Sequence, residues 1–161
     1  MSKTAIDVAY RLATLADLEL ALNLMQEFYA IERIQFEESW TRPVLMEFLQ
    51  NENYGQFWLV EANQAIAGYG IITFGYSLEL GGRDALLDEL YLRPAFQGQG
   101  IGSKMLALME STCRRQGIKV LSLVVDHHNP KARSLYERSG FRQPTRDILH
   151  KWLEPQPSMP S

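Results

Sequence analysis

Three glycines at every second position mark the part of this sequence best suited to binding a ligand. Gly98, Gly100 and Gly102 lie between a run typical of a strand and a run typical of a helix, within LRPAFQGQGIGSKML. The first four N–H groups of a helix have no partner inside the helix and carry a partial positive charge, so they bind phosphate where glycine lets the ligand approach. The spacing therefore predicts a phosphate-binding loop, with a flexible turn as the alternative interpretation.

Two common phosphate-binding motifs fit this loop poorly. A P-loop ends in Gly-Lys-Ser/Thr, whereas Gly102 is followed by Ser103 and then Lys104, which is the wrong order. A dinucleotide-binding fingerprint follows its strand by a tight turn, whereas residues 93–97 separate the expected strand from the first glycine. The P-loop is thus excluded, and the dinucleotide fingerprint is the weaker fit.

The hydrophobic pattern on both sides of the loop predicts the elements that hold it. Periodic apolar residues indicate helices, and β-branched or aromatic runs indicate strands. This pattern predicts strands over 5–13, 85–94, 118–126 and 146–154, a two-stranded hairpin over 55–77, and helices over 15–29, 41–50, 101–116 and 130–139. Asn129 precedes Pro130 as an N-cap residue precedes the first residue of a helix.

These elements predict an α/β (α+β) fold with a mixed, mainly antiparallel central sheet. We expect about six to seven strands flanked by about four helices. Residues 85–126 form the one parallel βαβ unit, because the strand over 118–126 is apolar throughout, as in a strand covered on both faces. The chain is expected to form a single domain over residues 1–153, followed by a disordered C-terminal tail over 154–161.

Composition and charge narrow the class of protein. The 161 residues carry a net charge of −3, which argues against a nucleic-acid-binding protein. No apolar run approaches the roughly 20 residues that span a bilayer, and the N-terminal residues lack the apolar core of a signal peptide. The single Cys113 is compatible with a reducing compartment. We therefore expect a cytoplasmic protein with no membrane contact; the sequence also allows a homodimer.

The segment QGQGIG, from Gln97 to Gly102, matches the pattern Gln/Arg-x-x-Gly-x-Gly/Ala. Together with LDELYLRPAFQGQGIGSKML around it and NPKARSLYERSGF farther on, it resembles the GNAT superfamily of N-acetyltransferases. In that family the loop amides hold the pyrophosphate of acetyl-CoA, the co-substrate. The resemblance is close over residues 85–141 and extends to the order of elements over 5–153, so the expected fold is GNAT-like.

The resemblance implies a set of residues that bind acetyl-CoA. Two strand residues supply backbone groups to the pantetheine arm, the loop and the start of the helix hold the phosphates, and one helix cap contacts the arm. In this order the residues are Leu90 and Leu92; Gln97, Gly98, Gly100, Gly102 and Ser103; and Asn129. His127 and His128 have no partners at metal-ligand spacing, so no metal is expected.

The resemblance also implies which residues donate and accept protons during acetylation. Tyr136 falls where the family places the general acid that protonates the leaving thiolate, and a phenol with a pKa of about 10 holds its proton at neutral pH. Asp88 and Glu89 are the acids nearest the thioester by sequence, and a regular strand directs them to opposite faces. We expect Glu89 to act as the base or substrate anchor, with Asp88 second. Packing for Tyr136 and solvation for the acids are the alternatives.

The region between the first two helices usually shapes the acceptor site in this family. Here acidic and aromatic residues alternate: Glu27, Phe28, Tyr29, Glu32, Phe36, Glu37, Glu38 and Trp40. Such a mixture suits a cationic amine, although an amphipathic helix with a solvated loop is the alternative. The predicted function is direct transfer of acetyl from acetyl-CoA to the primary amine of a polyamine, a lysine-like amino acid or an aminoglycoside. A protein amine acetyltransferase, a non-catalytic acyl-CoA-binding module and an NAD-dependent oxidoreductase are the alternatives.

Overall fold

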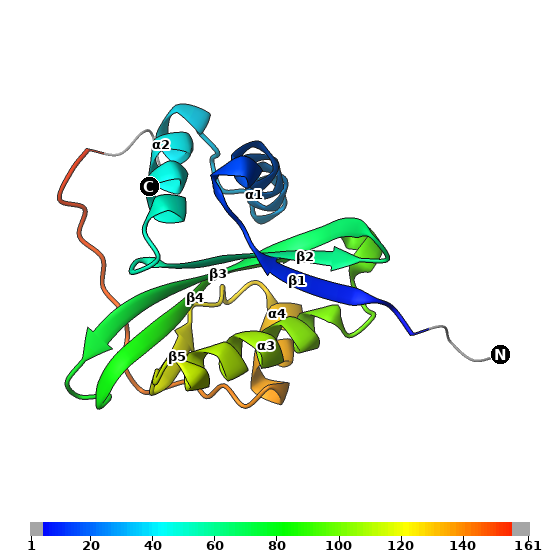
Figure 1. The fold of residues 1–161 in the computed structure, drawn as a ribbon. Coiled ribbons are helices and arrows are strands. Elements are labelled where there is room, and N and C mark those ends of the chain that lie inside the picture. Colours follow the sequence, from blue (N-terminus) through cyan, green and yellow to red (C-terminus); the bar gives the residue numbers. More distant parts are fainter. Residues whose placement is uncertain (1–4, 156–161) are drawn as a thin grey trace.

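The computed structural model describes residues 5–155 and has a five-stranded sheet in the order β1-β2-β3-β4-β5 (Figure 1). The elements are β1 (Val8–Leu12), η1 (Leu15–Asp17), α1 (Leu18–Glu32), α2 (Glu38–Gln50), β2 (Gly55–Ala62), β3 (Ala65–Ser77), β4 (Gly82–Leu92), η2 (Pro94–Phe96), α3 (Ile101–Arg115), β5 (Val120–Leu123) and α4 (Pro130–Arg138). Neighbouring strands from β1 to β4 are antiparallel, whereas β5 runs parallel to β4. The predicted mixed α/β fold with one parallel βαβ unit is confirmed.

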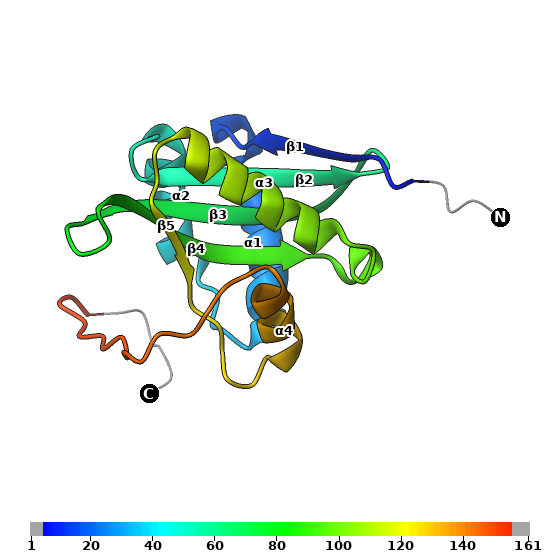
Figure 2. The ribbon, with the colours of Figure 1, turned by 90° about the horizontal axis from the view of Figure 1, so that it is seen from below.

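The helices form one layer on each face of the sheet. Helices α1 and α2 cover one face, and α3 and α4 cover the other (Figures 1 and 2). On the first face, Leu24 of α1 and Leu45 of α2 pack with Tyr69 of β3. On the second face, Met105 and Met109, which are four residues apart on α3, are buried in a separate core. The spacing of apolar residues in each helix thus places its apolar side on the sheet.

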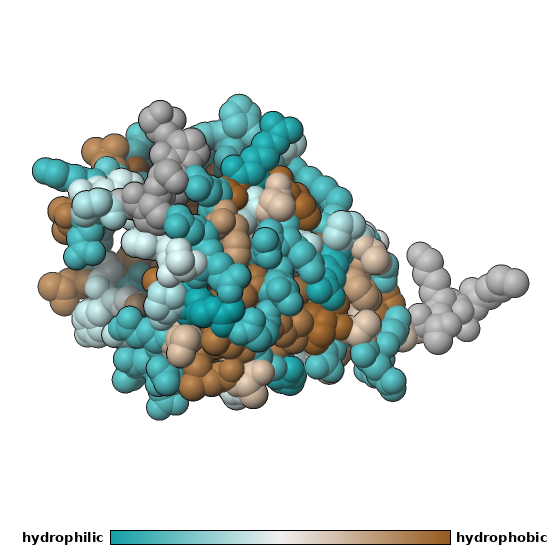
Figure 3. All heavy atoms as spheres, turned by 90° about the horizontal axis from the view of Figure 1, so that it is seen from above, coloured by the Kyte–Doolittle hydropathy of each residue, from teal (hydrophilic) through white to brown (hydrophobic). Residues whose placement is uncertain are grey.

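The outer side of α1 and α2 is mainly hydrophilic. Figure 3 looks onto this face and shows hydrophilic side chains with hydrophobic ones between them. None of the helices within residues 5–155 is long and apolar enough to cross a membrane.

The predicted last strand over 146–154 is wrong. Residues 142–155 contain no helix or strand, and Leu149 is 92% exposed. A segment with several apolar residues forms a strand only where a sheet edge offers backbone partners, and the residues of this segment do not by themselves supply such an edge. The sheet therefore has five strands instead of the six to seven expected. Residues 156–161 of the predicted disordered tail lie outside the described part of the chain.

The segment after α4 connects the two faces of the molecule. It leaves the α3–α4 face, passes the β4–β5 edge and reaches the side of α2 (Figure 1). This path brings Trp152 to the cavity under α2.

Strand β5 is shorter than its apolar sequence predicted. It covers only four residues, all half-buried, instead of the range 118–126. It pairs with β4 over residues 84–87 and then turns away from it (Figure 2). A strand at the edge of a sheet is covered by neighbours less completely than a central strand. The apolar run therefore predicted a longer and more deeply buried strand than β5 is.

Candidate active site

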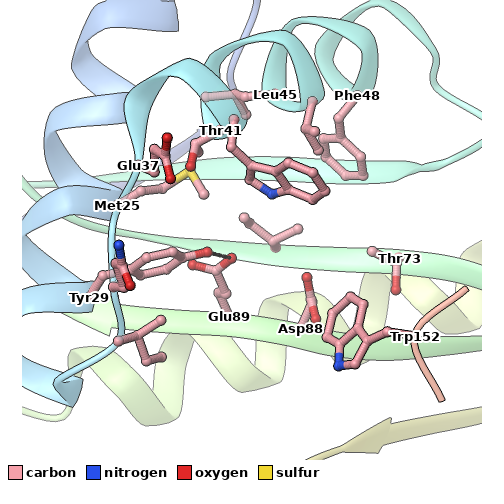
Figure 4. Close-up of a pocket in the computed structure, with 15 residues that line it drawn as sticks. Met25, Tyr29, Glu37, Thr41, Leu45, Phe48, Thr73, Asp88, Glu89 and Trp152 are labelled. Carbon is pink, nitrogen blue, oxygen red and sulfur yellow. Dashed lines mark hydrogen bonds between the residues drawn. The ribbon is translucent and has the colours of Figure 1, made fainter. Parts of the chain in front are cut away.

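A cavity of about 450 Å³ lies between the α1–α2 layer and the strands β3 and β4 (Figure 4). Its walls are mainly apolar and include Met25, Ile34, Val44, Leu45, Phe48 and Ile71. The polar side chains that line it include Tyr29, Glu37, Asp88 and Glu89. The cavity thus combines apolar walls with acidic groups, as small-molecule sites commonly do.

A β-bulge brings both predicted acids to this cavity. Ile71 of β3 pairs with Glu89 of β4, but Ile72 pairs with Leu87, so Asp88 is an extra residue in the ladder. An extra residue interrupts the alternation of side chains along a strand. Asp88 and Glu89 consequently line the same cavity (Figure 4). The expectation that they point to opposite faces is wrong, because it assumed a regular strand.

The carboxylate of Glu89 is held by two tyrosines. It accepts hydrogen bonds from the Tyr69 hydroxyl at 2.7 Å and the Tyr29 hydroxyl at 3.0 Å. Burial raises the pKa of the Glu89 carboxyl to about 7, because the two hydrogen bonds that favour the ionised form offset only part of the desolvation. The charge of Asp88 contributes further to this increase in the pKa. Near neutral pH, the protonated and ionised forms of Glu89 are therefore both populated.

Asp88 lies in a more open position. Its side chain is accessible to solvent, and desolvation by the surrounding protein raises the pKa of its carboxyl. The carboxylate is positioned to attract a cation to the cavity that also contains Glu89.

Tyr136 lies on α4 and is half-buried against the core of the α3–α4 face. Its ring contacts Phe141 edge to face, with centroids 6.0 Å apart. Burial, followed by the negative charge of Glu32, raises the pKa of the Tyr136 hydroxyl, which keeps it protonated at neutral pH. Tyr136 therefore packs in the core, as the alternative interpretation expected, and it also carries the proton that a general acid needs.

The end of α1 lies close to both candidate proton-transfer residues. Tyr29 donates to Glu89, and Glu32 interacts electrostatically with Tyr136. Tyr29 and Glu32 are three residues apart, which is about 4.5 Å along a helix axis. The last turn of α1 thus interacts with Glu89 on one side and with Tyr136 on the other.

Two of the three glycines in the loop have a left-handed backbone. Gly98 and Gly100 have φ angles of 73° and 79°, a left-handed conformation that strains other residues. Gly102 is different, because a Cβ there would lie 3.4 Å from Cδ2 of Leu135. The first two glycines therefore shape the turn, and the third allows α3 to approach α4. Ser103 is exposed in the first turn of α3.

Next to the loop, β4 has one edge that is not paired with β3. The Arg93 amide donates to the Ala67 carbonyl of β3 at 2.8 Å, and alternate residues of a strand direct their backbone groups to opposite sides. The groups of Leu90 and Leu92 therefore point to the side from which β5 has diverged. There the Leu92 carbonyl accepts a hydrogen bond from Nε2 of Gln97 at 2.9 Å. This edge offers the extended backbone that the predicted pantetheine contact requires.

The predicted helix cap and the two histidines lie after β5. The Asn129 side chain accepts a hydrogen bond from the Ala132 amide at 3.1 Å, which confirms it as the N-cap of α4. Within residues 5–155, no group of three or more His, Cys, Asp or Glu side chains is arranged to hold a metal ion.

Only part of the predicted acceptor region lines the cavity. Tyr29, Glu37 and Trp40 do so. The other members have different partners: Glu27 pairs with Arg93, Glu38 pairs with Arg42, Glu32 lies near Tyr136, and Phe28 and Phe36 pack in the core of the α1–α2 face.

Sequence reasoning missed the contribution of the later part of α2 and of the C-terminal segment. Val44, Phe48 and Trp152 line the cavity, although none was singled out as a site residue. A lone tryptophan near the end of the chain carries no local signal for a site that is formed more than 60 residues away, by Asp88. Only the path of the chain across the sheet edge could reveal it.

The fold is shared with solved structures, one of which is described as a predicted acetyltransferase. The integron cassette protein HFX_CASS3, from the mobile metagenome of Cole Harbour salt marsh, is 26% identical, with a TM-score of 0.81 over 91% of each chain. A predicted acetyltransferase from Clostridium acetobutylicum, solved with acetyl-CoA, has a TM-score of 0.77 at 21% identity, covering 90% of this chain and 96% of its own.

Residues 25–141 match the model of the acetyltransferase (GNAT) family. The chain therefore belongs to this family, which confirms the resemblance inferred from QGQGIG and its flanks. It is 32% identical over 125 residues to the uncharacterized N-acetyltransferase YhfO of Bacillus subtilis, which covers 76% of this chain and 80% of that protein. It is also 35% identical over 80 residues to the thialysine N-epsilon-acetyltransferase of Bos taurus. That match covers half of this chain and 46% of the relative.

Proposed function

We propose that this protein is an N-acetyltransferase that moves acetyl from acetyl-CoA directly to the primary amine of a small cationic acceptor. The observation that carries the proposal is Glu89, a carboxylate with a pKa of about 7 that lines the cavity beside Asp88. A base is most effective when its pKa lies near the working pH. Glu89 is also on the same strand as the open backbone edge at Leu90 and Leu92.

The described residues fit acetyl-CoA in two ways. The exposed loop over 97–100 leads into the N-terminus of α3, whose amides favour phosphate, and the β4 edge favours an extended amide chain. In this proposal residues 97–103 hold the pyrophosphate, Leu90 and Leu92 pair with the pantetheine arm, and Asn129 contacts that arm. When bound, acetyl-CoA supplies the acetyl group as a thioester.

Two residues of this chain move protons in the proposed reaction. Glu89 takes a proton from the acceptor ammonium, and the neutral amine nitrogen then forms a bond to the acetyl carbon while the carbon–sulfur bond breaks. Tyr136 donates its hydroxyl proton to the leaving sulfur. The nitrogen carries a positive charge once it is bonded to the acetyl carbon, so it loses a second proton to give the neutral amide, and a proton from solvent restores Tyr136. The products are an N-acetyl amine and the free thiol, and the proton held by Glu89 returns to solvent. Asp88 attracts the cationic acceptor.

One relative and the cavity support a small acceptor. The name of the Bos taurus relative indicates an enzyme that acts on a small amine, thialysine. The cavity of about 450 Å³ in this chain suits a small molecule better than a protein surface. A small cationic amine is therefore preferred over a protein amine.

Thiol release from acetyl-CoA, measured against a panel of amines, tests this proposal. We expect release that depends on the amine. Calorimetric titration with acetyl-CoA is the accompanying measurement, because tight binding without release for any acceptor would instead support a non-catalytic acyl-CoA-binding module.

Replacing Gly100 tests the loop. Gly100→Ala places a side chain at a φ of 79°, at a cost of about 1–2 kcal/mol, and relief of this strain displaces the loop amides. We expect the dissociation constant for acetyl-CoA, measured by calorimetry, to rise about tenfold, which corresponds to about 1.4 kcal/mol. Gly117→Ala is the matched control, because it has a φ of 72° at the other end of α3. Equal weakening by both variants would contradict a specific role of the loop.

The pH dependence tests Glu89. The carboxylate must be ionised to accept a proton, so kcat/KM should rise with pH below about 7 and level off above it. The hydrogen bond from Tyr69 lowers the pKa of Glu89, so Tyr69→Phe should move the inflection to higher pH. Tyr54→Phe, which removes a hydrogen bond to Glu47 outside the cavity, should leave it unchanged. If the inflection of the pH profile of kcat/KM stayed at the same pH in Tyr69→Phe, Glu89 would be excluded as the titrating group.

Several broader expectations stay predictions. They are a single domain over residues 1–153, a cytoplasmic location, and a homodimer. The absence of metal, nucleic-acid and membrane partners also stays a prediction.

A further inference from the structure

The charges that line the cavity have one sign. Glu37, Asp88 and Glu89 line it, and no Lys, Arg or His side chain is among the lining residues of the described chain. An acceptor carboxylate would meet these acids and apolar walls without a cationic partner. Burying an unpaired carboxylate is strongly unfavourable.

The cations next to lining residues in sequence do not change this balance. Arg42, beside Thr41, is held by Glu19 and Glu38. Arg33 and Lys151 each adjoin a lining residue, but neither lines the cavity.

Two indole rings border the cavity and are incompletely covered. Trp40 of α2 is 46% exposed, and Trp152 of the C-terminal segment is 64% exposed. Figure 4 shows Trp152 beside Asp88. A bound ligand with an apolar skeleton would cover part of these rings, and a nearby ammonium would also be attracted to the ring face.

We infer that the acceptor is a primary amine on an apolar aliphatic or aromatic skeleton without a carboxylate, and that Trp152 is one of its specificity-determining residues. This inference rests on the proposed acetyl transfer. The ammonium lies at Asp88 and Glu89, and the skeleton lies against Trp40, Phe48 and Trp152. An amino acid such as lysine is therefore a poor acceptor, in contrast to the thialysine on which the mammalian relative is named to act.

Matched pairs that differ only in a carboxylate test the inference. Phenethylamine is compared with phenylalanine, and cadaverine with lysine, by kcat/KM for thiol release. We expect the amine of each pair to be favoured about 100-fold, in line with a site that leaves a polar group unpaired. Equal use of both members would overturn the inference and leave the proposed acetyl transfer standing.

Equilibrium binding makes the test independent of turnover. Quenching of tryptophan fluorescence by phenethylamine and by phenylalanine reports the same discrimination without acetyl transfer. Equal affinities would overturn the inference. Tighter binding of phenethylamine without thiol release for any acceptor would support the inference about the cavity and contradict the proposed function.

Two variants test whether the preference for an amine over the matching amino acid arises in the cavity. Trp152→Ala should raise the KM for phenethylamine about tenfold, or about 1.4 kcal/mol, without changing the KM for acetyl-CoA. Leu153→Ala is the matched control, because Leu153 is 89% exposed and does not line the cavity. Val44→Arg adds a cation on the exposed side of α2 and should shift preference toward the amino acid of each pair by about tenfold. Failure of both variants to alter preference or KM would overturn the inference.

Discussion

The Glu89→Gln variant should lose about 100- to 10 000-fold in kcat, with little change in the KM for acetyl-CoA. Glutamine keeps the size of the side chain and an oxygen that can accept from Tyr69 at the position of the 2.7 Å hydrogen bond. It cannot accept a proton from the acceptor ammonium at neutral pH. Steady-state thiol release at pH 8 is the measurement, because wild-type Glu89 is mostly ionised there.

Stability separates this loss from unfolding. The folded protein raises the pKa of Glu89 from its usual value near 4.5 to about 7, so ionisation opposes folding as the pH rises through this interval. At pH 8 the wild type retains that unfavourable ionisation and the glutamine variant does not. The melting temperature of Glu89→Gln at pH 8 should therefore equal or exceed that of the wild type.

Asp88→Asn is the matched control for the assignment of the base. Asp88 lines the same cavity but is accessible to solvent, so its neutralisation should mainly raise the KM for the acceptor. If Glu89→Gln kept more than a tenth of wild-type turnover while Asp88→Asn lost it, the two roles would have to be exchanged.

The Tyr136→Phe variant should show a fall of about 100-fold in kcat, because the leaving thiolate loses its proton donor. Phenylalanine preserves the edge-to-face contact with Phe141, so acetyl-CoA affinity and the melting temperature should change little. The separation of kcat from KM distinguishes loss of a proton donor from disturbed binding. Unchanged turnover would show that Tyr136 has only a packing role.

Tyr10→Phe makes the same chemical change away from the site. The Tyr10 hydroxyl on β1 is buried without a hydrogen-bond partner among residues 5–155, so its removal leaves no group unpaired. Kinetic constants equal to the wild type are expected for this variant. A similar loss in both tyrosine variants would point to a general effect on folding.

The local backbone features of the proposed co-substrate site could be inferred from neighbouring residues, whereas their binding of acetyl-CoA stays a prediction. The left-handed φ angles of Gly98 and Gly100 and the cap made by Asn129 depend on residues within a few positions in the chain. The parallel βαβ unit followed from the order and composition of neighbouring elements.

The acceptor side depended on contacts between distant segments. Glu89 and its partner Tyr29 are 60 residues apart, and the increase in the pKa of Glu89 arises from burial that no single segment provides. The side on which Asp88 lies depended on a one-residue shift in the pairing of β3 and β4, which the alternation of β4 alone does not reveal.

The position of the C-terminal segment also depended on contacts with distant parts of the chain. Its apolar residues, which include Trp152, predicted a strand, but a strand also requires an edge with which to pair, and the chain instead crosses to the α1–α2 cavity. The sequence by itself determined the family, the order of the elements up to α4 and the glycine-rich turn before α3, because these depend on local conformation and composition, whereas phosphate binding by that turn stays a prediction. Only the tertiary structure decided which acids share a cavity and what surrounds them, because pairing register and burial are properties of segments brought together by folding.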